Sequence, residues 1–470
     1  MTDRTWGLIG MGVMGTSLAR NFGKKGVPLA LYNRYIKGSE EQIALERTQT
    51  YPELKEALAF ESLTQFINTL EQPRKILIML PAGSAVDRIL SELSPLLSEG
   101  DIIIDGGNSH YEDTERRAHL MVQKKFLFLG MGVSGGAEGA LNGPSLMVGG
   151  DIKGYQLVAK DLEILAAKNK HGKACCGYLG KGGAGHFVKM IHNGIEYAEM
   201  QLLAEIFELN LSSPDSSLET LQKQFSDWNN TESKSYLLDL TFKILGYQEK
   251  GKPFIDLISD QASNKGTGAW AASSGATTGF PNTVMTAALH ARYTSSFKSE
   301  RLKFAKLLKF APSVSPKEIP DLKNSYDLSR WINHHQGFDM IRHTGNNFGW
   351  ELNLSDIAQL WTEGCIIKSD LMDQLCILFK KHSSIFEMAV FQNLALKSKP
   401  EWSAVLEYAL TMNIPIPCLS SSLNYLLSMT QEQSSAHLIQ AQRDFFGAHG
   451  FERLDQEGRS LNHGPWHDQN

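Results

Sequence analysis

One segment of the chain places several reactive side chains at helical spacing. A glycine-rich run, residues 180–185, leads into a stretch with helical periodicity. Five polar side chains then share one helix face, an arc of roughly 140°, at positions i, i+3, i+4, i+7 and i+8: Lys189, His192, Asn193, Glu196 and Tyr197. This face combines a potential base, a potential acid and three hydrogen-bonding groups.

Two interpretations of this face are open. An amphipathic helix could present it to solvent, but exposed faces usually carry several Lys/Glu pairs rather than a Tyr-Asn-His cluster. The preceding glycines would also let a ligand approach the backbone closely. We therefore favour a functional site.

A second signal lies near the start of the chain. Residues 10–15 form a GxGxxG turn between a strand-like segment, Trp6–Ile9, and a helical segment that runs through Phe22. This context is typical of dinucleotide-binding turns, in which unpaired N–H groups at the helix N-terminus hold the pyrophosphate. Asn33 and Arg34 follow the second strand, where NAD enzymes normally have an acid. No carboxylate stands there to repel a 2′-phosphate, and Arg34 could bind one, so the sequence favours NADP over NAD.

Over the first 130 residues, short apolar runs alternate with helical stretches. We predict strands at Trp6–Ile9, Leu29–Tyr32, Ile76–Met79, Ile102–Asp105 and Phe126–Leu129. This alternation predicts a parallel sheet with helices on both faces. Beyond residue 180 helical periodicity dominates. The expected division is an α/β nucleotide-binding domain, 1–179, a large all-α domain, 180–435, and a short tail, 436–470.

The overall composition restricts the class of protein. A net charge of −5 gives no basic field for nucleic acid or acidic membranes. Five cysteines without a CxxC pair indicate reduced thiols rather than a disulfide framework or a zinc site. No signal-peptide core and no apolar run near ~20 residues is present, so we expect a cytoplasmic protein without a membrane span. No cluster of His, Cys and Asp requires a metal.

Longer motifs carry a resemblance to a known family. The glycine turn, residues 103–109 (IIDGGNS), residues 132–136 (GVSGG), the lysine helix and residues 439–449 (IQAQRDFFGAH) are similar to 6-phosphogluconate dehydrogenases. The matches run in order from residue 7 to residue 449. The shorter β-hydroxyacid dehydrogenases share the first domain and the lysine, but their helical part is much smaller.

The resemblance implies a Rossmann-like domain, a large helical domain and a tail that threads into the partner of a homodimer. It implies oxidative decarboxylation of 6-phosphogluconate to ribulose 5-phosphate with NADP+ and no metal, a step of the oxidative pentose phosphate pathway. Lys189 would be the general base and Glu196 the general acid. The implied substrate contacts are Asn108, Ser134, Gly135, Gly136, His192, Asn193, Tyr197, Lys265, Arg292, and, from the partner's tail, Arg443 and His449. The implied cofactor contacts are Gly10, Met11, Gly12, Val13, Met14, Gly15, Asn33, Arg34, Tyr35, Leu80, Pro81, Ala82 and Asn108.

The expected chemistry makes demands on these residues. Lys189 accepts a proton only when neutral, so burial or nearby cations must lower its pKa. Glu196 lies two turns, about 10 Å, farther along the helix and suits protonation at the far end of the reacting unit.

Two positions depart from the family pattern beside the cofactor. Tyr35 stands where a small hydroxyl residue is common, and Pro81 where Lys or Gln is usual. Two alternatives stay open: a relative that oxidises another sugar acid without decarboxylation, and a catalytically silent nucleotide-binding protein.

Overall fold

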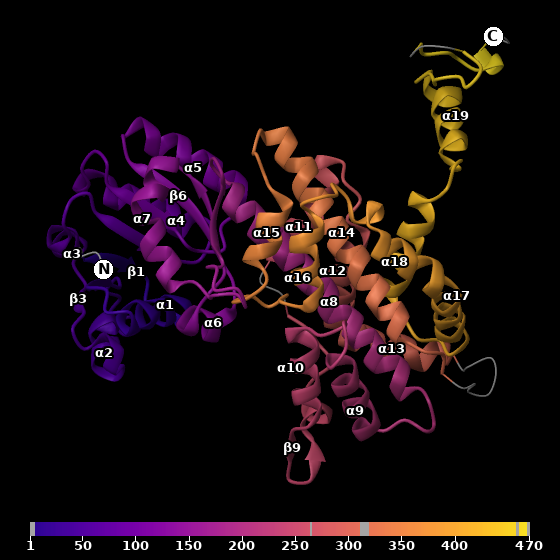
Figure 1. Cartoon of the computed structure of the whole chain (residues 1–470), viewed down its shortest axis with the longest axis horizontal. Coiled ribbons are helices and arrows are strands. Elements are labelled where there is room, and N and C mark those ends of the chain that lie inside the picture. The colour runs from indigo at the N-terminus through magenta and orange to yellow at the C-terminus, as the bar shows by residue number, and fades with distance from the viewer. Residues whose placement is uncertain (1–4, 264–265, 311–318, 457–459, 468–470) are drawn as a thin grey trace. The chain divides into compact units, whose positions relative to one another are not determined.

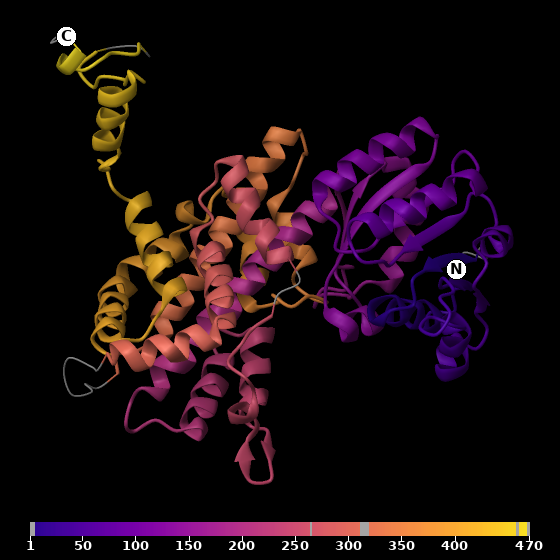
Figure 2. The ribbon, with the colours of Figure 1, turned by 180° about the vertical axis from the view of Figure 1, so that it is seen from behind.

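The computed structural model describes residues 5–263, 266–310, 319–456 and 460–467. The chain forms two compact units, Met1–Ser421 and Ser422–Asn470. The first contains a sheet layered with helices and a helical part (Figures 1 and 2). The predicted division at residues 179 and 435 stays a prediction.

Eight strands make one sheet in the order β3-β2-β1-β4-β5-β6-β7-β8. The strands are β1 Trp6–Ile9, β2 Leu29–Tyr32, β3 Leu58–Phe60, β4 Lys75–Ile78, β5 Ile102–Asp105, β6 Leu127–Val133, β7 Leu146–Gly150 and β8 Cys176–Gly180. The helices among them are α1 Val13–Lys24, α2 Ile43–Thr50, α3 Leu63–Thr69, α4 Ser84–Leu93, α5 Tyr111–Gln123, α6 Gly136–Asn142 and α7 Ile152–Leu165. The predicted parallel sheet is confirmed for the strands of the first 130 residues, and β7, which was not predicted, runs antiparallel to β6. The two strands are joined by a connection containing only the short α6, and an antiparallel return needs no long crossover.

The central strands are buried on both faces, as helices on both sides of a parallel sheet require. Trp6 and Leu8 of β1 belong to one buried cluster with Leu18 and Phe22 of α1. Ile9 belongs to the cluster on the other face. Alternate residues of one strand therefore anchor two separate helix layers.

The helical part follows β8 directly. Its helices are α8 Ala184–Leu211, α9 Leu218–Asn229, α10 Tyr236–Leu245, α11 Thr267–Thr278, α12 Thr283–Ser296, α13 Lys298–Leu308, α14 Lys323–Phe348, α15 Leu354–Leu360, α16 Asp370–Leu378, α17 Ala389–Thr411 and α18 Pro417–Met429, the last shared with the second unit, which also holds α19 Ala436–Gly447. A two-stranded ribbon, β9 Gln248–Glu249 and β10 Lys252–Pro253, projects from it (Figure 1). Among the described residues no helix is long and apolar enough to cross a membrane.

The long helix α8 joins the two parts of the first unit. Its first turn lies against the sheet so closely that a Cβ on Gly185 would stand 2.4 Å from the Met147 carbonyl oxygen. Farther along, α14 holds it through polar contacts that are buried. Arg330 Nε donates to Glu199 Oε1 at 3.1 Å, and Asn333 Nδ2 donates to the Ile195 carbonyl at 3.0 Å. These contacts fix the rotation of α8 and thus the direction of its polar face.

Candidate active site

A cavity of about 730 Å³ lies between the sheet and the helical part of the first unit. Four residues of the predicted helix face line it: Lys189, Asn193, Glu196 and Tyr197. His192 does not line the cavity and is completely buried behind it. The interpretation of this face as solvated is therefore wrong for α8, since only 7% of the Lys189 surface is exposed.

His192 links the lysine to the loop after β6. Its Nδ1 lies 3.3 Å from Lys189 Nζ, and its Nε2 lies 3.0 Å from Ser134 Oγ. Burial lowers the pKa of His192 well below its usual value, and the nearby Lys189 acts in the same direction. The neutral ring can accept from Lys189 at Nδ1 and donate to Ser134 from Nε2, which orients both side chains.

Burial moves the pKa values of the two candidate catalytic groups toward each other. It lowers the pKa of Lys189, against the nearby Glu196, because the cavity wall disfavours the ammonium form. It raises the pKa of Glu196, against the positive charges of Lys189 and Arg292. A neutral amine and a protonated carboxyl are thereby favoured in the same cavity.

The glycine turn lines the neighbouring wall. Gly12 precedes α1 and offers no capping side chain, so the first N–H groups of the helix are available to phosphate oxygens. Gly10 has φ +96°, and a Cβ on Gly15 would lie only 1.9 Å from the Gly10 carbonyl oxygen. Val13 and Met14 line the same cavity. The close turn and the unfilled helix end fit a dinucleotide pyrophosphate.

A second cavity of about 700 Å³ continues from the first, and the two share Gly12 and the segment 79–81. Gly10, Met11, Asn33 and Arg34 line it. Their contacts with the cofactor stay a prediction. Asn33 Oδ1 accepts the Met11 N–H at 3.0 Å and so ties the end of β2 to the glycine turn. Tyr35 does not line this cavity, and its side chain is exposed.

The remaining predicted contacts fall into three groups. Asn108, Ser134, Gly135, Gly136 and Arg292 line the first cavity, as do Leu80, Pro81 and Ala82. Lys265 lies outside the described residues. Arg443 and His449 lie in the second unit and are exposed within it.

Comparison with known proteins agrees with this architecture. The family model described as NAD binding domain of 6-phosphogluconate dehydrogenase matches residues 5–180, and that described as 6-phosphogluconate dehydrogenase, C-terminal domain, matches residues 185–466. The decarboxylating 6-phosphogluconate dehydrogenase of Escherichia coli is 38% identical, over 97% of this chain and 98% of its own length. That of Lactococcus lactis is 39% identical over the same shares. The chain belongs to the 6-phosphogluconate dehydrogenase family.

A solved structure supports the same assignment. The 6-phosphogluconate dehydrogenase of Plasmodium falciparum, described as apo, with NADP+ and with 6-phosphogluconate, superposes with a TM-score of 0.92 at 34% identity. The superposition covers 98% of this chain and 100% of that one.

Several residues of this family member line the first cavity without having been predicted. They are Met79, Gly106, Gly107, Val133, Met200, Ser263, Thr267 and Ile366. Met200 continues the helical spacing from Asn193 and Glu196, so the periodicity itself contained that signal. Ile366 arrives from a distant loop and carried no sequence signal.

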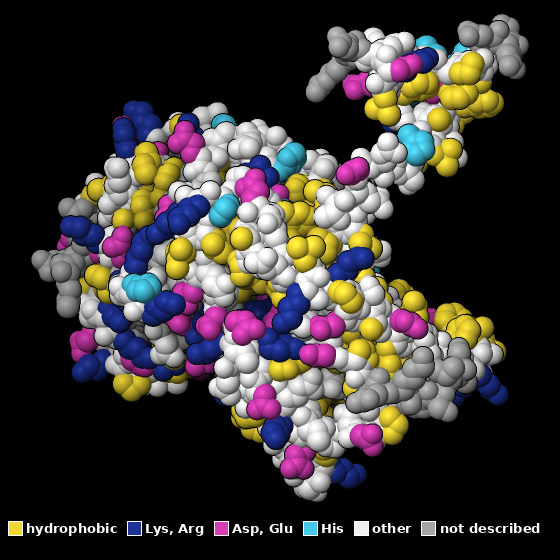
Figure 3. Space-filling model, turned by 45° about the vertical axis from the view of Figure 1, so that its right-hand side comes forward, with side chains coloured by type: hydrophobic (Ala, Val, Ile, Leu, Met, Phe, Trp, Pro, Cys, Tyr) yellow, Lys and Arg dark blue, Asp and Glu magenta, His cyan; other side chains and the backbone are white. Residues whose placement is uncertain are grey.

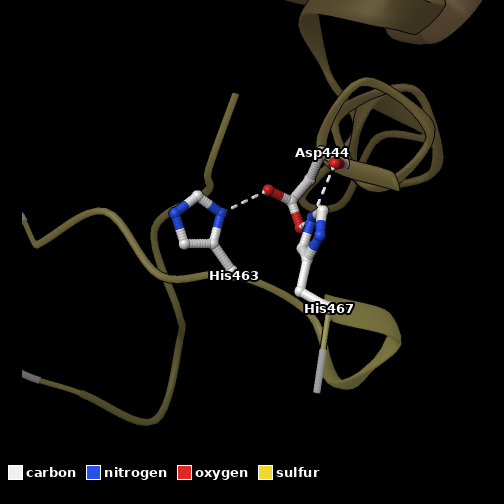
Figure 4. A group of neighbouring side chains, drawn as sticks. All are labelled: Asp444, His463 and His467. Carbon is white, nitrogen blue, oxygen red and sulfur yellow. Dashed lines mark hydrogen bonds and ion pairs between the residues drawn. The ribbon is translucent and has the colours of Figure 1, made fainter. Parts of the chain in front are cut away.

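The tail of this family member is organised around one buried carboxylate. Asp444 Oδ1 accepts from Gly450 N at 2.9 Å and His463 Nδ1 at 2.7 Å, and Oδ2 accepts from Gly464 N and Trp466 Nε1, both at 2.9 Å. Figure 4 shows the His463 and His467 rings directed at this residue, and His467 Nε2 bonds its backbone oxygen at 2.9 Å. Burial opposes the charge, but the N–H donors together hold the pKa of Asp444 below its usual range.

Ligand atoms of Asp444, His463 and His467 all lie within 4.8 Å of one another, a spacing that also suits a metal. Each carboxylate oxygen already accepts two N–H groups, so the hydrogen bonds account for the arrangement. We call Asp444 and its hydrogen-bond donors the hub. It fixes the neighbouring residue Arg443 and the loop that carries His449.

Proposed function

We propose that the chain oxidises 6-phosphogluconate at C3 and decarboxylates it to ribulose 5-phosphate, with NADP+ as oxidant. The observation that carries this proposal is the pairing, in one cavity, of a buried lysine and a buried carboxyl group beside a dinucleotide turn. NADP+ bound at the glycine turn, Asn33 and Arg34 supplies the hydride acceptor.

In the first step, neutral Lys189 takes the proton of the C3 hydroxyl as hydride leaves C3. The hydrogen bond between Lys189 and His192 holds the amine in place for this transfer. The product is a 3-keto acid whose carboxylate lies β to the carbonyl.

In the second step, the protonated Lys189 stabilises the negative charge that develops on the carbonyl oxygen as CO2 leaves. The oxygen takes the proton from Lys189 and an enediol remains. Glu196 then protonates the former C2 of the substrate, which becomes C1 of the ketose, while the former C3 hydroxyl returns its proton to Lys189. Its position, seven residues and about 10 Å along α8, suits a different atom from the one Lys189 serves.

Charged and polar groups of the cavity suit the rest of the substrate. Arg292 stacks on Tyr197, with its Cζ 3.7 Å from the ring centroid, and can offer its fork of donors to the substrate phosphate. Ser134, Asn193 and Asn108 can bind its hydroxyl and carboxylate oxygens.

The test follows NADPH absorbance and CO2 release together with 6-phosphogluconate. Lys189→Met should lose hydride transfer, by about 10²- to 10⁴-fold, since general base catalysis contributes that much. Glu196→Gln should bind both ligands and turn over far more slowly. Full activity of Lys189→Met would reject its role, and NADPH formation without CO2 would favour the non-decarboxylating alternative.

We also propose a homodimer in which each tail completes the partner's site. Several large apolar side chains of the second unit are exposed within it, as the yellow groups near the C-terminus in Figure 3 illustrate: Leu438, Ile439, Phe445, Phe446, Leu454 and Leu461. A partner surface would cover such groups. A cytoplasmic location is proposed as well, because five cysteines without a CxxC pair suit a reducing compartment.

A mixing experiment tests the exchange of tails. Lys189→Met and Arg443→Ala should each be inactive, but after subunit exchange the mixed dimers contain one intact site. Random exchange would then restore about a quarter of wild-type activity in a twofold dimer. No recovery, with mixed dimers demonstrated by mass, would reject tail exchange.

A further inference from the structure

The loop after β2 brings a carboxylate beside Arg34, although the residues that directly follow the strand include none. Ile36 and Glu40 form an antiparallel bridge in which each backbone N–H donates to the other's carbonyl oxygen at 2.8 Å. This reversal returns the chain to Arg34. Glu40 lies seven residues after Asn33 in the sequence, but the reversal places its side chain beside Asn33 and Arg34.

Three nitrogen donors from two side chains hold the Glu40 carboxylate in position. Arg34 Nη2 donates to Oε1 at 2.7 Å, and Arg34 Nε lies 3.3 Å from both oxygens. Asn33 Nδ2 donates to Oε2 at 3.0 Å. Since Asn33 also accepts the Met11 N–H, the carboxylate is connected through one side chain to the glycine turn.

This ion pair forms part of the wall of the second cavity, which both Arg34 and Glu40 line. The cations Arg47 and Arg88 and the carboxylate of Glu92 complete its charged groups. Arg47 is itself 3.1 Å from Glu46. The guanidinium fork that would receive a 2′-phosphate is thus already occupied by a carboxylate of the same chain.

The two dinucleotides place opposite demands on this position. A 2′-phosphate needs the Arg34 donors and is repelled by a nearby carboxylate, whereas the 2′-hydroxyl of NAD+ needs an acceptor, usually an acid at the end of the second strand. Glu40 supplies such an acceptor from the loop instead of the strand.

We propose that Glu40 is a specificity-determining residue: it competes with the 2′-phosphate of NADP+ for Arg34 and accepts a hydrogen bond from the 2′-hydroxyl of NAD+, so that it narrows the preference for NADP+. This inference rests on the proposed function, because it concerns the cofactor of that reaction. NADP+ binding requires Arg34 to leave Glu40, and the released carboxylate then stands beside the phosphate.

Calorimetric binding of two fragments tests the proposal without turnover. The probes are adenosine 2′,5′-bisphosphate and adenosine 5′-monophosphate, which differ only in the 2′-phosphate. In Glu40→Gln the bisphosphate should bind about three- to tenfold more tightly. The variant removes the carboxylate charge that repels the 2′-phosphate, which itself carries nearly two negative charges. The monophosphate should bind equally well or more weakly. The kcat/KM ratio for NADP+ over NAD+ should rise in the same variant.

Two further variants make the result specific. Glu99→Gln removes the carboxylate of another ion pair, 2.9 Å from Lys125 and outside both cavities, and should change neither affinity. Arg34→Ala should weaken bisphosphate binding and remove most of the gain from Glu40→Gln in the double variant. Unchanged or weaker bisphosphate binding in Glu40→Gln would overturn the proposal. Normal fragment binding by a wild-type protein that does not oxidise 6-phosphogluconate would instead reject the proposed function alone.

Discussion

The substitution Gly132→Ala, which adds one methyl group to β6, should displace the proposed base Lys189 without changing its chemical structure. Gly132 faces α8, and a Cβ there would stand 2.3 Å from Lys189 Cβ, 2.9 Å from its Cγ and 3.1 Å from the Gly185 carbonyl oxygen. Ordinary contact begins at 3.4 Å, so Gly132→Ala requires the lysine to move by about 1.1 Å. The nearest atom is Lys189 Cβ, which is attached directly to the backbone, so rotation about the outer bonds of the lysine side chain cannot remove the clash.

A displacement of about 1 Å at a reacting group costs roughly 100-fold in rate, or about 2.7 kcal/mol of transition-state stabilisation. Overpacking should also lower the free energy of unfolding by about 1–3 kcal/mol. The two effects are separable, since kcat measured well below the melting temperature reports only on the folded enzyme. Cofactor affinity should change little, because Gly132 lines neither cavity.

Gly139→Ala is the matched control. Its Cβ would meet the Ser134 and Gly364 carbonyl oxygens at 3.6 and 3.7 Å, which are ordinary contacts. This variant should retain both stability and kcat. If Gly132→Ala kept kcat within about twofold of wild type, the position of Lys189 would not be critical and its assignment as base would fail.

Three further outcomes follow from the structure. Burial lowers the pKa of Lys189, and kcat/KM should rise with pH as this amine loses its proton. Burial raises the pKa of Glu196, and kcat/KM should fall again at higher pH as this carboxyl loses its proton. In Glu196→Gln the fall at high pH should disappear, while the rise at low pH stays. Asp444→Asn removes the charge that holds Gly450 and Gly464, so their amide hydrogens should exchange faster with solvent, and retained protection would contradict the role of the hub. Glu199→Ala leaves Arg330 charged and buried, and thermal or denaturant unfolding should show a loss of about 3–5 kcal/mol. Replacing both residues with Met should cost clearly less, and equal losses would show that the ion pair is not the cause.

The sequence predicted five strands of the eight-stranded sheet from short apolar runs. It missed the three-residue β3 and two strands that each contain two glycines, β7 and β8. The predicted bounds of β1, β2 and β5 coincide with the observed ones, because these central strands are buried on both faces. β7 and β8 escaped prediction since glycines interrupt their apolar runs. Glycine also hid the second half of β6, which pairs with β7 at the edge of the cavity.

The site followed the same rule. Helical spacing grouped Lys189, Asn193, Glu196 and Tyr197 correctly, because neighbours on a helix are set by local geometry. Glu40 was missed because only the reversal of the loop at Ile36 brings it to Arg34. The burial of His192 behind the cavity wall could not be predicted either, since it depends on the loop that carries Ser134.

The two cavities share a wall at residues 79–81 and Gly12 but divide their tasks. With the second cavity assigned to the adenosine end as proposed, a substitution there changes no side chain of the reacting end on α8. Coenzyme preference and the chemistry on α8 are then expected to vary independently of each other.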